Sequence, residues 1–168
     1  LMKIGIDAMG GDFAPKAIVE GIILAAQELP ADITIILIGK VQDIQQILHN
    51  QNFKGVNIEI VESNETIEMG EHPVRALQSK PNSSIGVGFK LLKEGQVSAF
   101  CSAGNTGAMM VGSLFTLRTI GNLQRPPIAG YFPLKNGSYS LMLDIGANAD
   151  CKPEVLMQFA ELGSLYAK

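Results

Sequence analysis

Cysteine, histidine and tryptophan are scarce in this sequence: its 168 residues include two cysteines, two histidines and no tryptophan. Cys101 and Cys151 are too few for a disulfide framework and lack the paired spacing of a zinc site, so we expect a reducing, cytosolic compartment and no bound metal. Positive charge is also limited, because 13 Lys and Arg against 16 Asp and Glu give a net charge of −3. That balance argues against a nucleic-acid partner. The apolar runs are strand-length, far below the roughly 20 residues of a membrane-spanning helix.

The residues that are present predict a folded α/β protein, since 46% of them are hydrophobic and only 17% are charged. Strands are predicted at 3–7, 33–38, 56–61, 97–101, 128–132 and 140–144, and helices at 15–29, 41–50, 73–80, 83–94, 108–117 and from 153 onward. A polar stretch at 62–72 is expected to be a surface loop. This alternation predicts three α/β/α layers around a mostly parallel sheet. We expect residues 2–168 to form a single α/β unit, and we interpret Leu1 as a vector remnant.

Glycine-rich turns follow three of the predicted strands, at 8–12, 102–107 and 146–150. In parallel α/β sheets the ligand crevice lies beyond the carboxyl ends of the strands, so we expect the three turns to converge. In the second turn, Gly104 and Gly107 let the backbone approach a ligand, and Asn105 leads into a helix N-terminus that favours an anion. The alternative is that Asn105 or Thr106 only caps its helix and that the glycines serve close packing.

Nucleotide binding has little support in these turns. None of them ends in Gly-Lys-Ser or Gly-Lys-Thr, and none has the spacing of a dinucleotide-binding fingerprint. The acids Asp7, Asp12 and Asp144 flank the turns, where carboxylates serve as metal ligands or as general acids and bases. The plainer interpretation is that Asp12 caps a helix and that Asp144 ends a strand.

Covalent catalysis is also weakly supported. Cys101 follows a predicted strand, and His49 or His72 is its conceivable base, but both histidines lie in polar surroundings. We therefore interpret Cys101 as a small buried hydrophobic residue. Ser102 lacks the surrounding glycines of a nucleophile elbow. What the turns offer is a set of backbone amides, side-chain amides, carboxylates and a few cations, suited to binding a reacting anion.

The three turn motifs, taken together, resemble one family. They read Asp-Ala-Met-Gly-Gly-Asp at 7–12, Ser-Ala-Gly-Asn-Thr-Gly at 102–107 and Asp-Ile-Gly-Ala-Asn-Ala-Asp at 144–150. Their order and separation are similar to those of the bacterial phosphate acyltransferases, the fatty acid and phospholipid synthesis proteins. These enzymes convert acyl-[acyl carrier protein] and inorganic phosphate to acyl phosphate. The resemblance runs the whole chain and includes Pro73-Val74-Arg75 and Arg125-Pro126.

The resemblance implies a fold related to isocitrate and isopropylmalate dehydrogenases and to phosphotransacetylases. It also implies a homodimer without a cofactor, in the cytoplasm at the inner face of the membrane, where a glycerol-3-phosphate acyltransferase is the downstream partner. Members are about twice this length, so the sequence is expected to be the N-terminal half of a longer chain.

The turn chemistry and the resemblance together give the expected site. We expect catalytic roles for Asn105 and Thr106 at the anion and for Asn148 and Lys152 as further polar groups. Substrate-binding roles are expected for Asp7, Gly10, Gly11, Asp12, Ser102, Gly104, Gly107, Arg125 and Asp144. Two alternatives stay open. One is a nicotinamide-dependent hydroxy-acid dehydrogenase of the related fold, and the other is a non-catalytic half-domain that binds an anion or a carrier protein.

Overall fold

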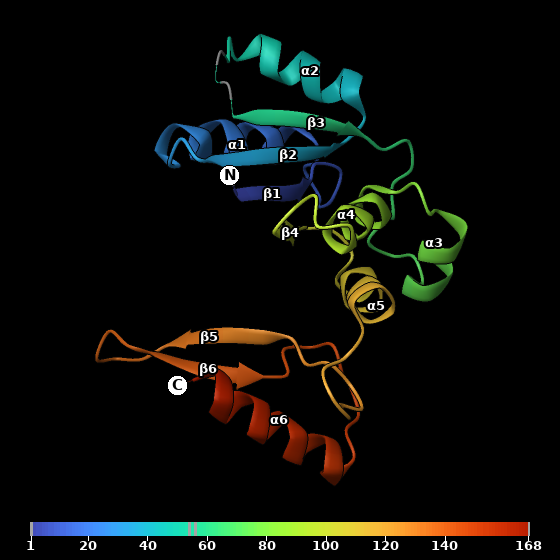
Figure 1. The fold of residues 1–168 in the computed structure, drawn as a ribbon, viewed down its shortest axis with the longest axis vertical. Helices are drawn as coiled ribbons and strands as arrows, with labels where there is room; N and C mark the ends of the chain where they lie inside the picture. The colour runs from blue at the N-terminus through green and yellow to red at the C-terminus, as the bar shows by residue number, and fades with distance from the viewer. Residues whose placement is uncertain (1, 54, 56, 168) are drawn as a thin grey trace. The chain divides into compact units, whose positions relative to one another are not determined.

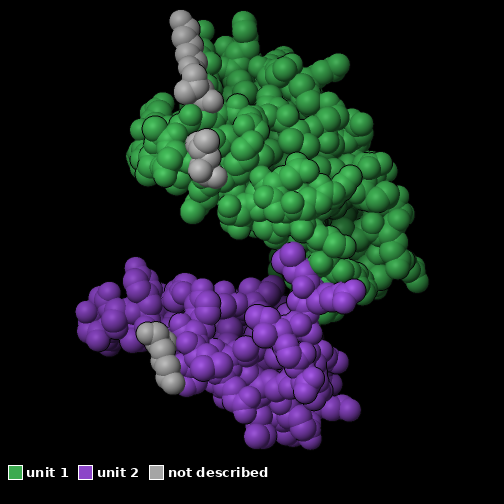
Figure 2. All heavy atoms as spheres, in the orientation of Figure 1, with its two compact units in different colours: residues 1–116 green, residues 117–168 purple. Residues whose placement is uncertain are grey.

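The computed structural model describes residues 2–53, 55 and 57–167, and the chain divides into two compact units. The first unit spans residues 1–116 and the second 117–168 (Figure 2). Leu1 and the predicted strand start at Val56 lie outside the described residues. The expectation of one unit over residues 2–168 stays a prediction, and each unit is described by itself.

The first unit is built on a parallel sheet (Figure 1). In chain order its elements are β1 (Met2–Asp7), α1 (Lys16–Glu28), β2 (Ile33–Gly39), α2 (Val41–Asn50), β3 (Ile58–Glu62), α3 (Pro73–Ser79), α4 (Ser84–Lys93), β4 (Ala99–Cys101) and α5 (Thr106–Leu117). The four strands have the spatial order β3-β2-β1-β4. All three strand pairs are parallel, as in Ile4 beside Ile35 and Ile4 beside Ala99.

The central strand β2 is buried on both faces, which explains its nearly continuous run of β-branched residues. Ile35 and Leu37 pack with residues of α1 and α2 on one face. Ile36 and Ile38 point to the other face, where Leu91 of α4 covers them. Helices therefore cover both faces of the sheet, which confirms the predicted three-layer α/β/α architecture.

The helix starts show which local signals set the boundaries. Ser83 caps α4, because its hydroxyl accepts a hydrogen bond from the backbone N–H of Gly86 at 3.2 Å. Helix α1 differs from the expectation that Asp12 caps it. Its N-cap position is Pro15, no side chain bonds there, and Asp12 lies in the preceding turn. Residues 12–15 form a turn before α1 begins at Lys16, so Asp12 comes too early in the chain to take the N-cap position.

The second unit contains a β-hairpin and one helix. Strands β5 (Ala129–Pro133) and β6 (Tyr139–Leu143) pair antiparallel, and α6 (Pro153–Tyr166) follows. Val155 and Phe159 are the buried residues of α6. Farther along this helix, Gly163 lies against the side chains of Leu141 and Leu143. Among the helices of the described residues in both units, we find none with the length and apolar character needed to span a membrane.

Candidate functional site

The strand order creates a switch point between β1 and β4. From β1 the chain adds β2 and then β3 on one side, and it later returns to place β4 on the other side. In open α/β sheets the crevice beyond the carboxyl ends of two such strands is the usual ligand site. The turns that follow β1 and β4 are the first and second glycine-rich turns, so the strand order brings these two motifs to one place.

A buried carboxylate joins the two turns. Asp7, at the end of β1, is 1% exposed. One carboxylate oxygen accepts the hydroxyl hydrogen bond of Ser102 at 2.6 Å, and the other accepts the backbone N–H of Met9 at 2.9 Å. The same Ser102 hydroxyl accepts the N–H of Gly104 at 3.0 Å. A continuous hydrogen-bond chain therefore runs from the first turn through Asp7 and Ser102 into the second turn.

The turns also touch directly, through glycines that leave no room for a side chain. A Cβ atom built on Gly10 would lie 2.7 Å from the backbone nitrogen of Gly104 and would also collide with the carboxylate of Asp7. Gly11 faces the backbone of Ala103 and has a φ of +106°, a conformation open to glycine and costly for other residues. The glycines of this motif are required by close backbone approach as well as by turn geometry.

Asn105 caps α5 and fastens a neighbouring loop. Its side-chain oxygen accepts the N–H of Ala108 at 2.9 Å, the usual bond of a helix N-cap. Its side-chain NH₂ donates to the carbonyl oxygens of Glu68, Met69 and Glu71 at 3.0–3.2 Å. Asn105 is 5% exposed, and both ends of its amide have protein partners. We expected this side chain to contact an anion, but its hydrogen bonds are made within the protein. This agrees with the alternative interpretation that Asn105 caps its helix.

The other residues of the second turn face different surroundings. Thr106 is exposed and opens α5, and the first N–H groups of a helix, here those of Thr106 and Gly107, have no partner within the helix itself. Gly107 packs against Pro73 at the start of α3, where a Cβ would collide with the proline ring. The turn therefore combines N–H groups that lack a partner within the helix with a glycine that serves close packing.

The stretch at 63–72 is more constrained than the expected surface loop. Ile67 is buried with Ala76, Ile85 and Phe89. Lys80 donates to the carbonyl oxygen of Thr66 at 2.8 Å and pairs with the carboxylate of Glu71 at 2.5 Å. The Lys80 hydrogen bond lowers the pKa of Glu71 below its ordinary value, although desolvation acts in the opposite direction. Hydrogen bonds from the side chains of Asn105 and Lys80 therefore hold this loop in place.

Two hollows flank the paired turns. A polar cleft of 600 Å³ is lined by Met9, Gly11, Asp12, Ala14, Lys40, Thr66, Glu68, Met69 and Gly70. A mainly apolar hollow of 370 Å³ is lined in part by Ala17, Gly21, Cys101 and Ser102. The sequence prediction missed Lys40 and the loop residues of the polar cleft. Their signal was available, because both segments follow the carboxyl ends of β2 and β3 and so reach the same edge of the sheet.

The third glycine turn, in the second unit, is organised by Asp144. One of its carboxylate oxygens accepts the N–H of Ile128 at 2.5 Å, and the other accepts the N–H groups of Ala147 and Asn148 at 2.9 and 2.6 Å. Partial burial raises the pKa of Asp144, but these hydrogen bonds together outweigh desolvation and lower it below its ordinary value. The side chain of Asn148 donates to the carbonyl oxygen of Pro126 and to Asp144.

The two cationic residues expected at the site in this unit, Arg125 and Lys152, differ in their hydrogen bonding. The guanidinium of Arg125 donates to the carbonyl oxygen of Asp150 at 3.0 Å, which ties the third turn to the segment before β5. Lys152 is exposed at the N-cap position of α6 and makes no side-chain capping bond. The first two glycine-rich turns converge as expected. That the third turn also meets them stays a prediction.

Cys101 is exposed, which corrects the interpretation of this residue as a buried hydrophobic one. Strand order explains the difference, because β4 pairs only with β1 and lies at the end of the described sheet. His49 lies in the last turn of α2, and His72 directly precedes α3. Within residues 2–53, 55 and 57–167, no three His, Cys, Asp or Glu side chains gather as metal ligands do.

Comparison with known proteins shows which family carries these turns. The family model described as "Fatty acid synthesis protein" matches residues 2–168. The chain belongs to this family. It is 44% identical over 167 residues to a phosphate acyltransferase of Salinibacter ruber, which covers 99% of this chain and 49% of that protein. It is 47% identical to phosphate acyltransferases of Dictyoglomus thermophilum and Pelotomaculum thermopropionicum, over 98% and 99% of this chain and 48% of each relative.

The chain thus spans about half the length of the curated relatives it matches. A solved structure of the EutD phosphotransacetylase from Staphylococcus aureus superposes with a TM-score of 0.63 over 95% of this chain and 50% of that one, at 19% identity. This likeness confirms the phosphotransacetylase-type fold that the motifs implied. The relation to isocitrate and isopropylmalate dehydrogenases stays a prediction.

Proposed function

We propose that the protein to which this chain belongs transfers the acyl group of acyl-[acyl carrier protein] to inorganic phosphate, giving acyl phosphate and the free carrier thiol. The observation that carries this proposal is the 44–47% identity to phosphate acyltransferases along nearly the whole chain. The meeting of the first two motifs at the switch point supports a binding site in this half. The names of the relatives favour this function over the dehydrogenase alternative.

The reaction we propose is a direct displacement at the thioester carbonyl. A phosphate oxygen forms the new bond to the carbonyl carbon, a tetrahedral intermediate collapses, and the carbon–sulfur bond breaks to release the carrier thiolate. A substantial fraction of phosphate is already a dianion near neutral pH, so the attack requires no strong base. The protein has to hold the anion beside the thioester, exclude water and donate hydrogen bonds to the developing oxyanion.

The second turn is our proposed anion site, with the backbone N–H groups of Thr106 and Gly107 as its donors. The positive end of the α5 dipole favours an anion there. We assign Asn105 to positioning rather than to direct contact, because its amide already bonds Ala108 and the 68–71 carbonyls. Asp7 and Ser102 act in the same way by fixing the turn. Gly10, Gly11, Asp12 and Gly104 shape the cleft beside it.

The remaining parts of the proposal concern the whole protein. We keep Asn148 and Lys152 as further catalytic polar groups, and Arg125 and Asp144 as substrate-binding residues, in and beside the third turn. The relatives are about twice as long, so we place the rest of the catalytic unit beyond these 168 residues. We further propose a cytoplasmic homodimer without a cofactor. It works at the inner face of the membrane, beside the glycerol-3-phosphate acyltransferase that uses acyl phosphate.

Phosphate dependence tests this function. Free thiol released from palmitoyl-[acyl carrier protein] is measured with and without phosphate, for this chain and for the full-length protein. We expect phosphate-dependent release by the full-length protein. Equal release in both conditions identifies a thioesterase, and no release by a folded full-length protein refutes the acyltransferase assignment.

A further inference from the structure

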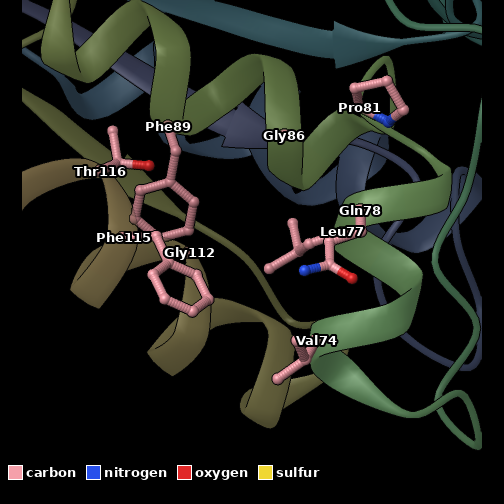
Figure 3. Close-up of a pocket in the computed structure, with 9 residues that line it drawn as sticks. All are labelled: Val74, Leu77, Gln78, Pro81, Gly86, Phe89, Gly112, Phe115 and Thr116. Atoms are coloured by element: carbon pink, nitrogen blue, oxygen red, sulfur yellow. The ribbon is translucent and has the colours of Figure 1, made fainter.

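A third pocket of the first unit lies among three helices. It has a volume of 380 Å³ and is lined by α3, α4 and α5 (Figure 3). All of its lining residues lie within residues 1–116. The volume is at the lower end of the 300–1,000 Å³ typical of small-molecule sites. We call it the helical groove.

The walls of the helical groove are mainly apolar. Val74 and Leu77 of α3 form one side, and Phe115 of α5 forms the other. The floor is the buried ring of Phe89, which lies against the bare backbone of Gly112, where a Cβ would collide with the ring. Phe89 also packs edge-on against Phe100, with ring centroids 5.3 Å apart. The floor is therefore well packed, while Phe115 on the lip stays 65% exposed.

The helical groove begins next to the proposed anion site. Pro73 starts α3 and touches Gly107 in the first turn of α5, and Val74 is the next residue of α3. Along α5, Phe115 and Thr116 lie about two and a half turns farther on, so the groove extends to about 15 Å from Thr106 at a helical rise of 1.5 Å per residue. Figure 3 shows Val74 and Thr116 at opposite ends, with Phe115 and Leu77 between them.

We propose that the helical groove binds the hydrocarbon tail of a long-chain acyl thioester, with the carbonyl at the Val74 end and the tail directed toward Thr116. This inference rests on the proposed function, because that function supplies a substrate with a reactive head and a long apolar tail. A tail laid between Leu77 and Phe115 covers an aromatic side chain that is otherwise exposed. Gln78, an exposed polar residue of α3, also lines the groove.

The length of the helical groove makes the proposal quantitative. Each methylene that the groove buries is expected to raise affinity roughly fourfold, the equivalent of about 0.8 kcal/mol, until the tail reaches Thr116. Beyond that point added methylenes stay in solvent and the affinity levels off. A bulkier residue at Thr116 shortens the groove and moves this limit to shorter chains.

The test uses the full-length protein and saturated fatty acids of increasing length, which displace a fluorescent fatty acid. Turnover of palmitoyl- and octanoyl-[acyl carrier protein] is measured on the same preparations. The Thr116→Trp variant fills the far end, and Phe115→Gln removes an exposed apolar wall without touching the core. Leu24→Trp adds an indole to an exposed position of α1 and is the matched control.

We expect Thr116→Trp to lower the ratio of palmitoyl to octanoyl turnover at least tenfold and to shorten the preferred fatty acid. Phe115→Gln should weaken binding of all long chains, and Leu24→Trp should change neither readout. An unchanged ratio and unchanged binding in both groove variants overturn the proposal. Uptake of the fluorescent fatty acid by the 168-residue chain but not by the full-length protein also overturns it, because the groove is then covered by another part of the protein.

The two proposals fail differently. If the full-length protein turns over no acyl thioester at all, the proposed function falls, and the fatty acid series alone decides the helical groove. If turnover is phosphate-dependent but insensitive to both groove variants, the function stands and the acyl tail binds elsewhere.

Discussion

Replacing Gly10 by alanine tests whether the two turns depend on direct backbone contact. The added Cβ would lie 2.7 Å from the backbone nitrogen and 2.9 Å from the Cα atom of Gly104, and it would collide with the Asp7 carboxylate. The Gly104 atoms belong to the backbone, and the buried Asp7 carboxylate is held by hydrogen bonds from Ser102 and Met9, so the turns themselves must separate. Overpacking of this kind costs about 1–3 kcal/mol. At about 2–4 °C per kcal/mol for a chain of this size, the midpoint of thermal unfolding should fall by roughly 2–12 °C.

Alanine substitutions at two other glycines allow the three variants to be ranked by stability. Gly104→Ala brings a Cβ to 3.1 Å from the Cα of Gly10 and from the Ser102 hydroxyl, so it should destabilise less than Gly10→Ala. Gly21 lies in α1 with no atom within 4 Å of a built Cβ, and Gly21→Ala should stabilise the protein by about 0.5–1 kcal/mol. Differential scanning calorimetry and urea unfolding followed by circular dichroism give the order. A Gly10→Ala protein as stable as the wild type refutes the close-contact explanation.

Three further predictions concern individual hydrogen-bonding groups. Asn105→Asp keeps the helix cap, but it turns a carboxylate toward three carbonyl oxygens, so it should destabilise the protein more than Asn105→Ala does. In both variants, amide hydrogen exchange at residues 66–71 should become faster. Ser83→Ala removes the cap of α4 and should cost about 1 kcal/mol in urea unfolding. Because its pKa is lowered by folding, Asp144 contributes stability above its unfolded pKa of about 3.9, and this contribution is lost as the pH falls through the folded value. In Asp144→Asn, the free energy of unfolding should therefore fall less steeply as the pH is lowered below neutrality. Unfolding is monitored by tyrosine fluorescence.

Controls and contrary outcomes follow from the same contacts. All three tyrosines, Tyr131, Tyr139 and Tyr166, lie in the second unit, so tyrosine fluorescence reports on the unit that contains Asp144. If the free energy of unfolding falls as steeply with decreasing pH in Asp144→Asn as in the wild type, the stabilising role of the Asp144 carboxylate is contradicted. For Asn105, unchanged exchange at 66–71 in both variants shows that its amide does not hold the loop. Equal stability of Ser83→Ala and the wild type removes the cap from the account of α4.

Local patterns in the sequence predicted most of the helices and strands. The run at 33–38 is apolar on both faces, and such a run fits a central strand of a parallel sheet. Turn residues after the strands likewise indicated the edge at which a site forms. These features depend on neighbouring residues only, which is why the sequence reveals them.

Features that depend on strand order were not predictable in the same way. Cys101 is exposed because β4 lies at the end of the described sheet, a fact that no local pattern carries. The loop at 63–72 is polar, but Ile67 enters the core of α3, α4 and α5. Asn105 was recognised as a site residue, yet the pattern left open whether its amide faces a ligand or the protein. Only the contact of this turn with the 68–71 loop decides that.

The most direct test of the central claim is to identify the product. The full-length protein is incubated with palmitoyl-[acyl carrier protein] and phosphate, and ³¹P NMR is recorded while free thiol is measured in parallel. We predict a new acyl phosphate signal that grows in a one-to-one ratio with released thiol and is absent without enzyme. Thiol release accompanied by free fatty acid and no acyl phosphate would contradict the claim, because the acyl group would then have gone to water.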